Sequence, residues 1–186
     1  MDTQELLRRY AAGQRAFMRT NLEGANLSGA TLQGINLEDA NLMGANLSGA
    51  DLSEAILMGA FLVKVNFEGA NLAGAALIRA SCSHGNWRRV NLEGAQLRKA
   101  YLTDLDLEGA IFKGADLSFA TLTYCNLRNA NFEGAIWTME EVTLGSVDLT
   151  GAVGFDPRDG GGHSVTLPNG EYVEFTWDFV ERKHGS

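Results

Sequence analysis

Large apolar residues recur at every fifth position of the chain from Phe17 to Trp137, and the register runs through 25 positions without an insertion. The residue two positions before each of them is usually small, and it is Ala in 17 of the 25 cases. The residue between the two is Asn or Asp in 14 cases. A period of five fits neither the 3.6-residue turn of a helix nor the alternation of a strand. A chain that buries one large and one small side chain every five residues must turn at a fixed rate, so the pattern predicts a solenoid.

The repeating unit, for example Ala25-Asn26-Leu27-Ser28-Gly29, resembles the A(D/N)LXX motif of the pentapeptide-repeat family over Arg15 to Met139. The resemblance implies an all-β solenoid, namely a right-handed quadrilateral parallel β-helix with four pentapeptides to a coil. The repeats then make about six coils, stacked roughly 4.8 Å apart. The outward Asn and Asp side chains are expected to bond the backbone of the turns. The opening residues are similar to those of cyanobacterial members of the family.

Both ends of the chain depart from the repeat, which divides the chain into three parts. Residues 1–14 are expected to form an N-terminal capping helix with Thr3 as its N-cap and Gly13 as its stop. The resemblance implies that residues 15–139 form the pentapeptide-repeat β-helix. Residues 140–186 are expected to form a C-terminal cap with a linker and a β-hairpin.

The C-terminal part carries its own pattern. We expect a helical turn at 139–142, a shifted strand at 147–149 and a linker at 154–162. Asn169-Gly170 lies between two alternating segments, 164–167 and 171–179, which is a strong signal of a β-hairpin. The apolar face of this hairpin either covers the end of the rod or docks on a partner. We favour the first, because an open sheet end needs cover.

The repeat is weakest between Arg79 and Val90. Trp87 overfills a core position, and Gly85 beside it lacks the Ala methyl, so the two compensate in volume. One interpretation is a locally repacked coil. The other is a recognition coil that presents the densest basic cluster of the chain, formed by Arg79, His84, Arg88, Arg89, Arg98 and Lys99.

Apolar residues at outward positions suggest a second candidate surface, because these positions are normally polar. They are either scattered surface residues or a binding surface for another protein or a second copy, which would then pair through this apolar face or through the hairpin. The candidates are Met43, Phe61 and Val63 on one face, Ile56, Met58 and Ile78 on the adjoining face, and Tyr101, Phe119 and Tyr124 near the same edge.

Composition and charge limit the function classes. The 186 residues have a formal net charge of −8, but the repeats hold 12 acidic and 10 basic residues and the part after Trp137 holds 9 acidic and 3 basic ones. A subset of the family binds DNA gyrase by imitating duplex DNA, which requires an acidic rod; a nearly neutral one argues against it. The polar opening and the lack of a long apolar run predict a cytoplasmic protein without a membrane span.

No constellation for catalysis is found in the sequence. The three His residues are scattered, and His84 has no second His nearby for a metal site. Cys82 and Cys125 lie two coils apart, too far for a disulfide. We therefore expect a non-enzymatic protein-interaction module without cofactor, metal, nucleic acid or small-molecule substrate, whose partner is another protein. The alternatives are a DNA-mimic inhibitor or protector of gyrase and a passive structural spacer.

Overall fold

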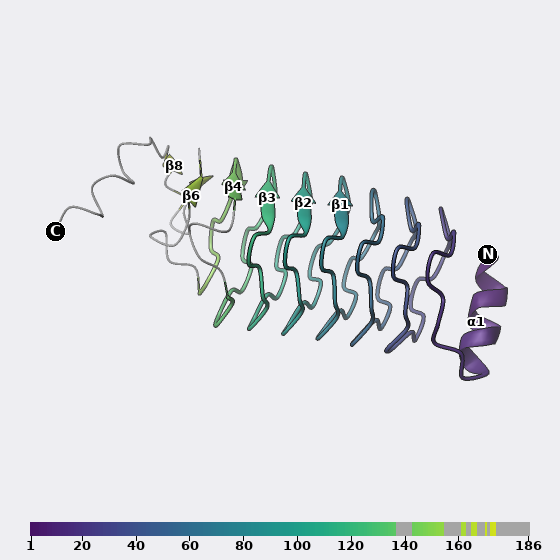
Figure 1. Ribbon diagram of the computed structural model, residues 1–186. Coiled ribbons are helices and arrows are strands. Elements are labelled where there is room, and N and C mark those ends of the chain that lie inside the picture. The colour runs from purple at the N-terminus through teal and green to yellow at the C-terminus, as the bar shows by residue number, and fades with distance from the viewer. Residues whose placement is uncertain (137–142, 155–160, 163–164, 167–169, 171, 174–186) are drawn as a thin grey trace.

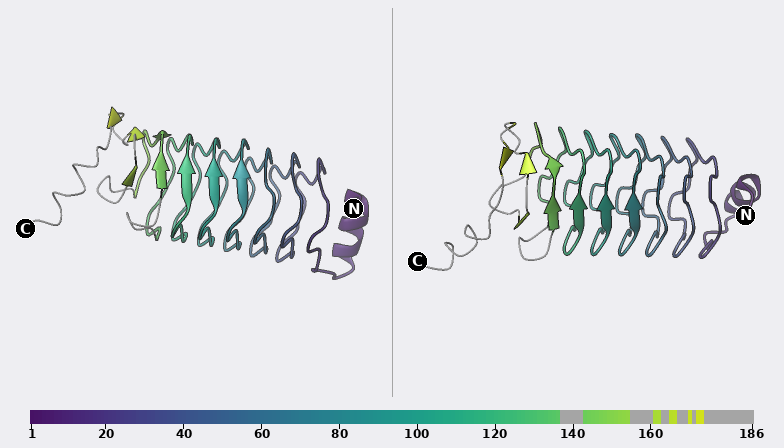
Figure 2. Two further views of the ribbon diagram at one scale, coloured as in Figure 1. Left: turned by 45° about the horizontal axis from the view of Figure 1, so that its top comes forward. Right: turned by 90° about the horizontal axis from the view of Figure 1, so that it is seen from above.

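The computed structural model shows a rod of stacked coils with a helix across its N-terminal end (Figures 1 and 2). It describes residues 1–136, 143–154, 161–162, 165–166, 170 and 172–173. Parallel one-residue bridges join residues 20 apart, from Ala16 with Asn36 to Asp116 with Ile136. Each coil therefore contains four pentapeptides, and every fifth residue brings the chain to the next face. The predicted solenoid of parallel strands is confirmed.

Each coil has four faces, one for each pentapeptide, and they are numbered 1 to 4 in chain order. Face 1 holds Leu37, face 2 Leu42, face 3 Leu47 and face 4 Leu52, and each face recurs every 20 residues. These four side chains are fully buried, and in the described part of the chain no polar or charged residue is buried with them. The core is thus a continuous apolar column, as the five-residue period requires.

Backbone hydrogen bonds hold each coil to its neighbour and close each turn. The Leu42 amide donates to the Phe61 carbonyl in the next coil at 3.0 Å, and the Ala45 amide donates back to the Leu42 carbonyl at 2.9 Å. Between them, the Asn41 side-chain oxygen accepts from the Met43 amide at 3.0 Å. The same bond recurs along the rod, so the expected role of the outward Asn and Asp side chains is confirmed.

Strands longer than a single bridge occur mainly on face 2. Four of them lie in line along one side of the rod (Figure 2) and pair in parallel through Cys82, Leu102, Leu122 and Leu144. The sheet they form contains β1 (Ser81–Ser83), β2 (Tyr101–Thr103), β3 (Thr121–Thr123), β4 (Thr143–Gly145) and β6 (Gly161–Gly162). A second sheet contains β5 (Val147–Asp148), β7 (Val165–Thr166) and β8 (Tyr172–Val173).

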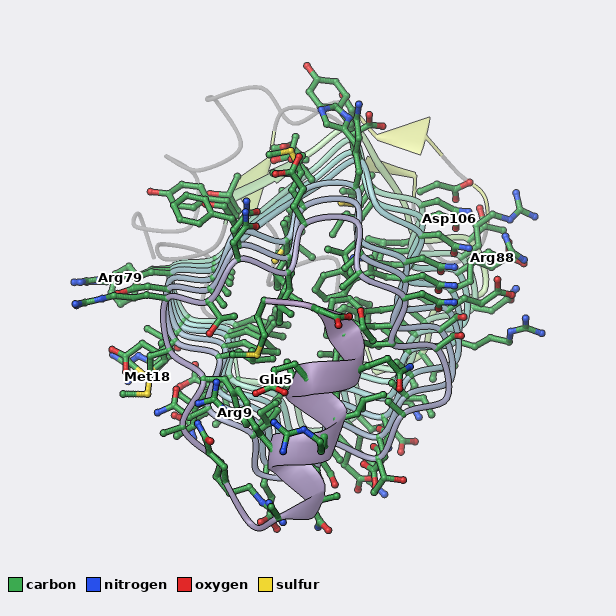
Figure 3. All side chains as sticks on the ribbon, turned by 90° about the vertical axis from the view of Figure 1, so that its right-hand side faces the viewer. Glu5, Arg9, Met18, Arg79, Arg88 and Asp106 are labelled. Atoms are coloured by element: carbon green, nitrogen blue, oxygen red, sulfur yellow. The ribbon has the colours of Figure 1, made fainter. Side chains whose placement is uncertain are left out.

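The N-terminal helix α1 (Thr3–Ala11) lies across the first coil, as Figure 3 shows along the rod axis. Its N-cap is Asp2, one residue before the predicted Thr3, because the Asp2 carboxylate accepts the Gln4 amide. Leu6 is fully buried against the coil, and the Tyr10 hydroxyl donates to the Gln33 carbonyl at 2.8 Å. Within the described residues, no helix has the length and apolar character to cross a bilayer.

Past residue 136 the coil continues with two extra residues. Asp148 pairs with Asn126, and Val153 with Asn131, which are 22 residues apart, so the ladder runs beyond the predicted boundary at 139. The predicted shifted strand is present as β5. The predicted linker at 154–162 is partly wrong, because Gly161–Gly162 form β6 and pair with β4.

The described part of the predicted hairpin is also paired. β7 and β8 are antiparallel, with Val165 opposite Val173, which confirms the hairpin at these residues. β7 also pairs in parallel with β5 and so continues the face-3 ladder. The helical turn expected at 139–142 and the apolar residues expected at 175–179 lie outside the described residues.

The irregular coil is closely packed around Trp87. The Trp87 ring is fully buried and meets the Phe67 ring edge to face, with 4.8 Å between centroids. A Cβ on Gly85 would lie only 2.7 Å from the indole nitrogen of Trp87 and 2.6 Å from the Val65 carbonyl oxygen. The predicted compensation between a large Trp and a missing methyl group is confirmed.

Candidate protein-binding face

Face 2 differs in its backbone from the regular coil. In a regular turn, the amide of the small residue donates to the core residue before it, as Ala95 does to Leu92 at 3.0 Å. On face 2 this bond is stretched to 3.5 Å between Val65 and Leu62, and the following coils run extended as β1, β2 and β3. The small position after these strands holds Gly85, Leu105 and Cys125 instead of Ala.

The corner residues along the two borders of face 2 are mostly not glycine, whereas those at the other two corners are mostly glycine. The last residue of each pentapeptide has a positive φ, which costs an L-residue roughly 1 kcal/mol more than glycine. In the described part of the chain, thirteen non-glycine residues have φ between 50° and 60°. Ten of them border face 2: Arg19, Asp39, Lys64, Arg79, His84, Lys99, Asp104, Phe119, Tyr124 and Ser146. Glycine would adopt this conformation at lower cost, so face 2 keeps side chains along its borders at a conformational cost.

The border with face 1 forms what we call the basic–aromatic edge, made of Phe61, Arg79, Lys99, Tyr101 and Phe119. The three aromatic rings are about half exposed, at 52%, 59% and 45% for Phe61, Tyr101 and Phe119. The Lys99 ammonium lies 5.6 Å from the centre of the Phe119 ring. Among the described residues, neither Arg79 nor Lys99 has a carboxylate within 4 Å. The edge thus offers cations and aromatic surface together.

The border with face 3 is polar. His84, Asp104 and Tyr124 stack in consecutive coils, with 2.5 Å between the His84 Nδ1 and Asp104 Oδ2 atoms. They line an open hollow of about 400 Å³ together with Gly85, Leu105, Asp106 and Asn126. These residues offer hydrogen-bond donors and acceptors but neither a serine nor a cysteine nucleophile. The hollow therefore suits recognition of a polar group better than covalent catalysis.

The nine apolar candidates from the sequence lie on two adjacent faces. Ile56, Met58 and Ile78 are on face 1, and the other six are on face 2 or its borders. Ile56, Val63 and Ile78 are half-buried and the remaining six are exposed. The sequence analysis missed four further exposed apolar residues on faces 1 and 4: Met18, Ile111, Ile136 and Val153.

The six basic candidates do not form one cluster. Arg79, Arg98 and Lys99 lie on face 1 and its border with face 2, His84 at the border with face 3, and Arg88 and Arg89 on face 3 and its far border. Viewed along the rod, Arg79 projects to the opposite side from Arg88 and Asp106 (Figure 3). The predicted single surface is therefore corrected, because the chain passes to another face every five residues.

Most of these cations are also paired with acids. Arg88 lies 2.6 Å from Glu108 and 3.1 Å from Asp106, Arg89 lies 2.5 Å from Glu68, and Arg98 lies 3.8 Å from Asp116. Residues 20 apart stand above one another, so a base in one coil meets an acid in the next. The pairs are at least partly exposed, so they add little stability each. On face 3 the basic side chains are thus paired with acidic ones, whereas Arg79 and Lys99, at the basic–aromatic edge, have no such pair among the described residues.

Lys64 is a border residue that the sequence analysis overlooked. Its φ of 58° and its place between Val63 and Val65 put it at the corner of faces 2 and 3. The sequence does contain a signal for Lys64. If the last residue of each pentapeptide is assigned to one of the four corners of the coil, most of the non-glycine residues fall at the two corners that border face 2. That assignment needs only the sequence and the number of repeats per coil.

The cysteines and acidic residues form neither a redox nor a metal site in the described part of the chain. Cys82 and Cys125 are free and buried, and burial raises the pKa of both thiols, that of Cys125 to about 11. Such thiols are poor nucleophiles at neutral pH. Within the described residues, no group of three His, Cys, Asp or Glu side chains is arranged to hold a metal ion.

A coil of four pentapeptides with a buried Leu and Ala column defines a β-solenoid whose flat faces project side chains to solvent. The chain belongs to the pentapeptide-repeat family. The family model for pentapeptide repeats matches it in eight copies, at residues 20–59, 77–114, 100–136 and 110–153. No curated protein sequence matches it significantly.

Two solved cyanobacterial structures resemble this fold over most of the chain. HetL, a pentapeptide repeat protein involved in heterocyst differentiation regulation in Nostoc sp. strain PCC 7120, is 26% identical, with a TM-score of 0.50 and coverage of 93% of this chain and 100% of HetL. Rfr23 from Cyanothece 51142 is 29% identical, with a TM-score of 0.51 and coverage of 75% of this chain and 97% of Rfr23. A shorter match is alr5209 from Nostoc PCC 7120, at 38% identity, a TM-score of 0.43 and coverage of 56% and 80%.

Proposed function

We propose that this chain is a non-enzymatic protein-interaction module, and that face 2 with its two borders is the surface that binds another protein. The observation that carries the proposal is the placement of ten of the thirteen non-glycine, positive-φ residues along the borders of face 2. Each is a side chain held outward at a conformational cost, which a passive spacer does not require.

The chemistry of face 2 agrees with protein recognition. Phe61, Tyr101 and Tyr124 are more than half exposed on or beside a flat strand surface. Aromatic residues, and arginine such as Arg79, are enriched where proteins bind one another. HetL, which has a similar fold, is involved in regulation, and a binding module without catalysis is consistent with such a role.

The test compares two variants in the full chain. Phe61→Ser with Tyr101→Ser removes aromatic surface from face 2, and Ile111→Ser removes an exposed apolar side chain from the opposite face 4. All these side chains are exposed, so far-UV circular dichroism and thermal unfolding should match the unchanged protein. In quantitative pulldowns from the native host, the face-2 variant should lose proteins that the unchanged protein and the Ile111 variant retain. Equal capture by all three would refute face 2 as the binding surface.

Gyrase inhibition by DNA mimicry is the alternative with the weaker support. The repeats carry 12 acidic and 10 basic residues, and face 2 is bordered by Lys64, Arg79 and Lys99. A DNA-binding surface is itself basic and would repel these side chains. A supercoiling assay separates the two functions: inhibition at micromolar protein supports mimicry, and unimpaired supercoiling supports the interaction module.

A further inference from the structure

The outward residues of face 1 change from acidic to basic along the rod. In the second coil, the residues after the core Leu37 are Glu38 and Asp39, and in the fifth coil the equivalent residues are Arg98 and Lys99. The third and fourth coils between them present apolar side chains, which are Ile56, Met58, Ala76 and Ile78. Face 1 thus carries an acidic coil and a basic coil on either side of an apolar centre.

The acidic and basic coils of face 1 are too far apart to pair within the rod. Glu38 and Arg98 lie three coils apart, about 14 Å along the axis. In the described part of the chain, Asp39 and Arg98 make long and exposed ion pairs, at 3.6 Å to Arg19 and 3.8 Å to Asp116. On face 3, by contrast, opposite charges alternate from coil to coil and pair directly. Face 1 therefore presents opposite charges that another molecule can pair.

A second copy of the rod, turned antiparallel, carries the matching groups. A two-fold axis between two such faces, which crosses the rods between the third and fourth coils, reverses the order of the coils and keeps each column of residues in place. The residues that then meet are Glu38 with Arg98, Asp39 with Lys99, Met58 with Ile78, Ile56 with Ala76, Asn36 with Gln96, and Arg19 with Phe119. None of these pairs brings like charges together, so face 1 is complementary to itself.

The order of the charges selects the antiparallel arrangement. In a parallel pair, each coil would meet the same coil of the second copy, so Glu38 and Asp39 would face carboxylates and Arg98 would face another Arg98. Such contacts repel. Antiparallel contact instead joins each acidic coil to a basic one, and it covers the apolar third coil with the apolar fourth.

The same arrangement supplies the counter-charge that the basic–aromatic edge lacks. The Asp39 carboxylate leans over Gly59, because its Oδ1 atom lies 2.5 Å from where a Cβ on Gly59 would be. In the antiparallel pair, Gly59 of one copy lies opposite Arg79 of the other, and Asp39 lies opposite Lys99. One carboxylate thus faces both of the cations that have no carboxylate within 4 Å in the described part of their own chain.

We propose that this protein forms an antiparallel pair with a second copy of itself through face 1. Six coils of one face measure about 29 Å by about 10 Å. This is a small footprint for a dimer, so the dissociation constant is expected in the micromolar range. The pairing goes beyond the proposed function, because it joins two copies of the chain and leaves the flat surface of face 2 free for another protein. Only the side chains of the basic–aromatic edge are shared between the two contacts.

The first test measures self-association of the purified full chain by sedimentation velocity over a range of concentrations. Glu38→Arg and Arg98→Glu each place like charges opposite one another twice in the pair, so each should weaken the dimer roughly tenfold or more. The double variant Glu38→Arg with Arg98→Glu exchanges the two charges and should restore the dissociation constant to within about threefold. As the control, Lys113→Glu makes the same change in net charge at an exposed position of face 4 and should leave the dimer unchanged.

A short bis-maleimide cross-linker tests the antiparallel register. Met18→Cys and Ser118→Cys are made in separate chains. These two positions meet across the antiparallel pair, whereas each lies about 24 Å along the axis from its own equivalent. The native Cys82 and Cys125 are buried and do not interfere. Covalent dimers should form when the two variants are mixed, and not from either variant alone.

The outcomes that would overturn the pairing are distinct from those of the pulldown. A chain that stays monomeric at several hundred micromolar refutes it, and so does a double charge variant that fails to recover the dimer. Equal weakening by Lys113→Glu contradicts the choice of face, and cross-links from Met18→Cys alone contradict the orientation. All of these measurements use purified protein, so their failure leaves the binding of another protein to face 2 intact, and a failed pulldown leaves the pairing intact.

Discussion

Replacing Gly85 by Ala should destabilise the protein, although Ala fills this position in 17 of the 25 repeats. The Cβ would lie 2.6 Å from the Val65 carbonyl oxygen and 2.7 Å and 2.9 Å from the Trp87 Nε1 and Cδ1 atoms. Contacts this short force the backbone or the indole to move, and overpacking of this kind costs about 1–3 kcal/mol. Ala also restricts the unfolded chain, which offsets about 0.4–1 kcal/mol. The expected net loss is therefore up to about 2.5 kcal/mol, with a midpoint near 1.3 kcal/mol.

Gly145→Ala is the matched control for this prediction. Neither Gly85 nor Gly145 has a positive φ; Gly145 directly follows the face-2 core residue Leu144, whereas Gly85 stands three residues after the face-2 core residue Cys82. A Cβ on Gly145 meets the Thr123 methyl at 3.2 Å, and a side-chain end can shift where a backbone carbonyl cannot. We expect a change within about 0.5 kcal/mol for the control. Guanidinium unfolding followed by far-UV circular dichroism measures both variants, with equal m-values as the condition for comparing them.

A double variant tests the cause of the loss. Two of the three close contacts of the Gly85 Cβ are with Trp87, so Gly85→Ala should cost less when Trp87 is already Phe. The indole nitrogen is buried without a hydrogen-bond partner in the described structure, so Phe also removes an unsatisfied donor. The reasoning is refuted if Gly85→Ala is as stable as Gly145→Ala, or if its cost is the same with Phe at position 87.

Three further predictions concern the core, the thiols and pH. Leu72→Asp places a charge in a fully buried mid-rod position and should abolish cooperative thermal unfolding, whereas an unchanged melting curve would contradict the column of buried residues. Cys82 and Cys125 should resist iodoacetamide at pH 8 until the protein unfolds, because burial raises both pKa values; rapid labelling of the native protein contradicts this. Burial raises the pKa of Asp148, but hydrogen bonds from Thr150 and the charge of Arg128 outweigh it and leave the pKa below its ordinary value. The lowered pKa contributes stability above the pKa of the unfolded chain, and this stability is lost as pH falls through the lower folded value. The stability difference between the protein and Asp148→Asn should thus shrink from about pH 5 to pH 2, and a difference constant over that range argues against the pairing.

The fold was predictable to an unusual extent because the repeat is local. Each Leu, Ala and Asn position follows from its place in a pentapeptide, and the same turn hydrogen bonds recur from coil to coil. In the sequence, the five-residue period simply ends after Trp137. The two extra residues between Asn126 and Asp148 hide the fact that the parallel pairing between coils continues beyond that point. Pairing of Gly161–Gly162 with β4 was missed because glycine-rich sequence normally indicates a linker.

The candidate site was predictable in its residues but not in its grouping. Sequence analysis selected Phe61, Arg79, Lys99, Tyr101 and Phe119, yet it divided them between an apolar surface and a basic one. The structure places them on one border, and it puts Arg88 on the opposite side of the rod from Arg79 (Figure 3). Neighbours along the sequence diverge on a solenoid, whereas residues 20 apart become neighbours.

By itself, the sequence determined that this chain is a solenoid and which side chains are buried, because a five-residue period leaves one inward arrangement. Only the tertiary structure decided which outward residues meet. It gave Arg88, Arg89 and Arg98 acidic partners one coil away and left Arg79 and Lys99 without one among the described residues. It also showed that the positive-φ side chains gather along face 2. The physical reason is that burial depends on position within a repeat, whereas contact between surface groups depends on how the coils are stacked.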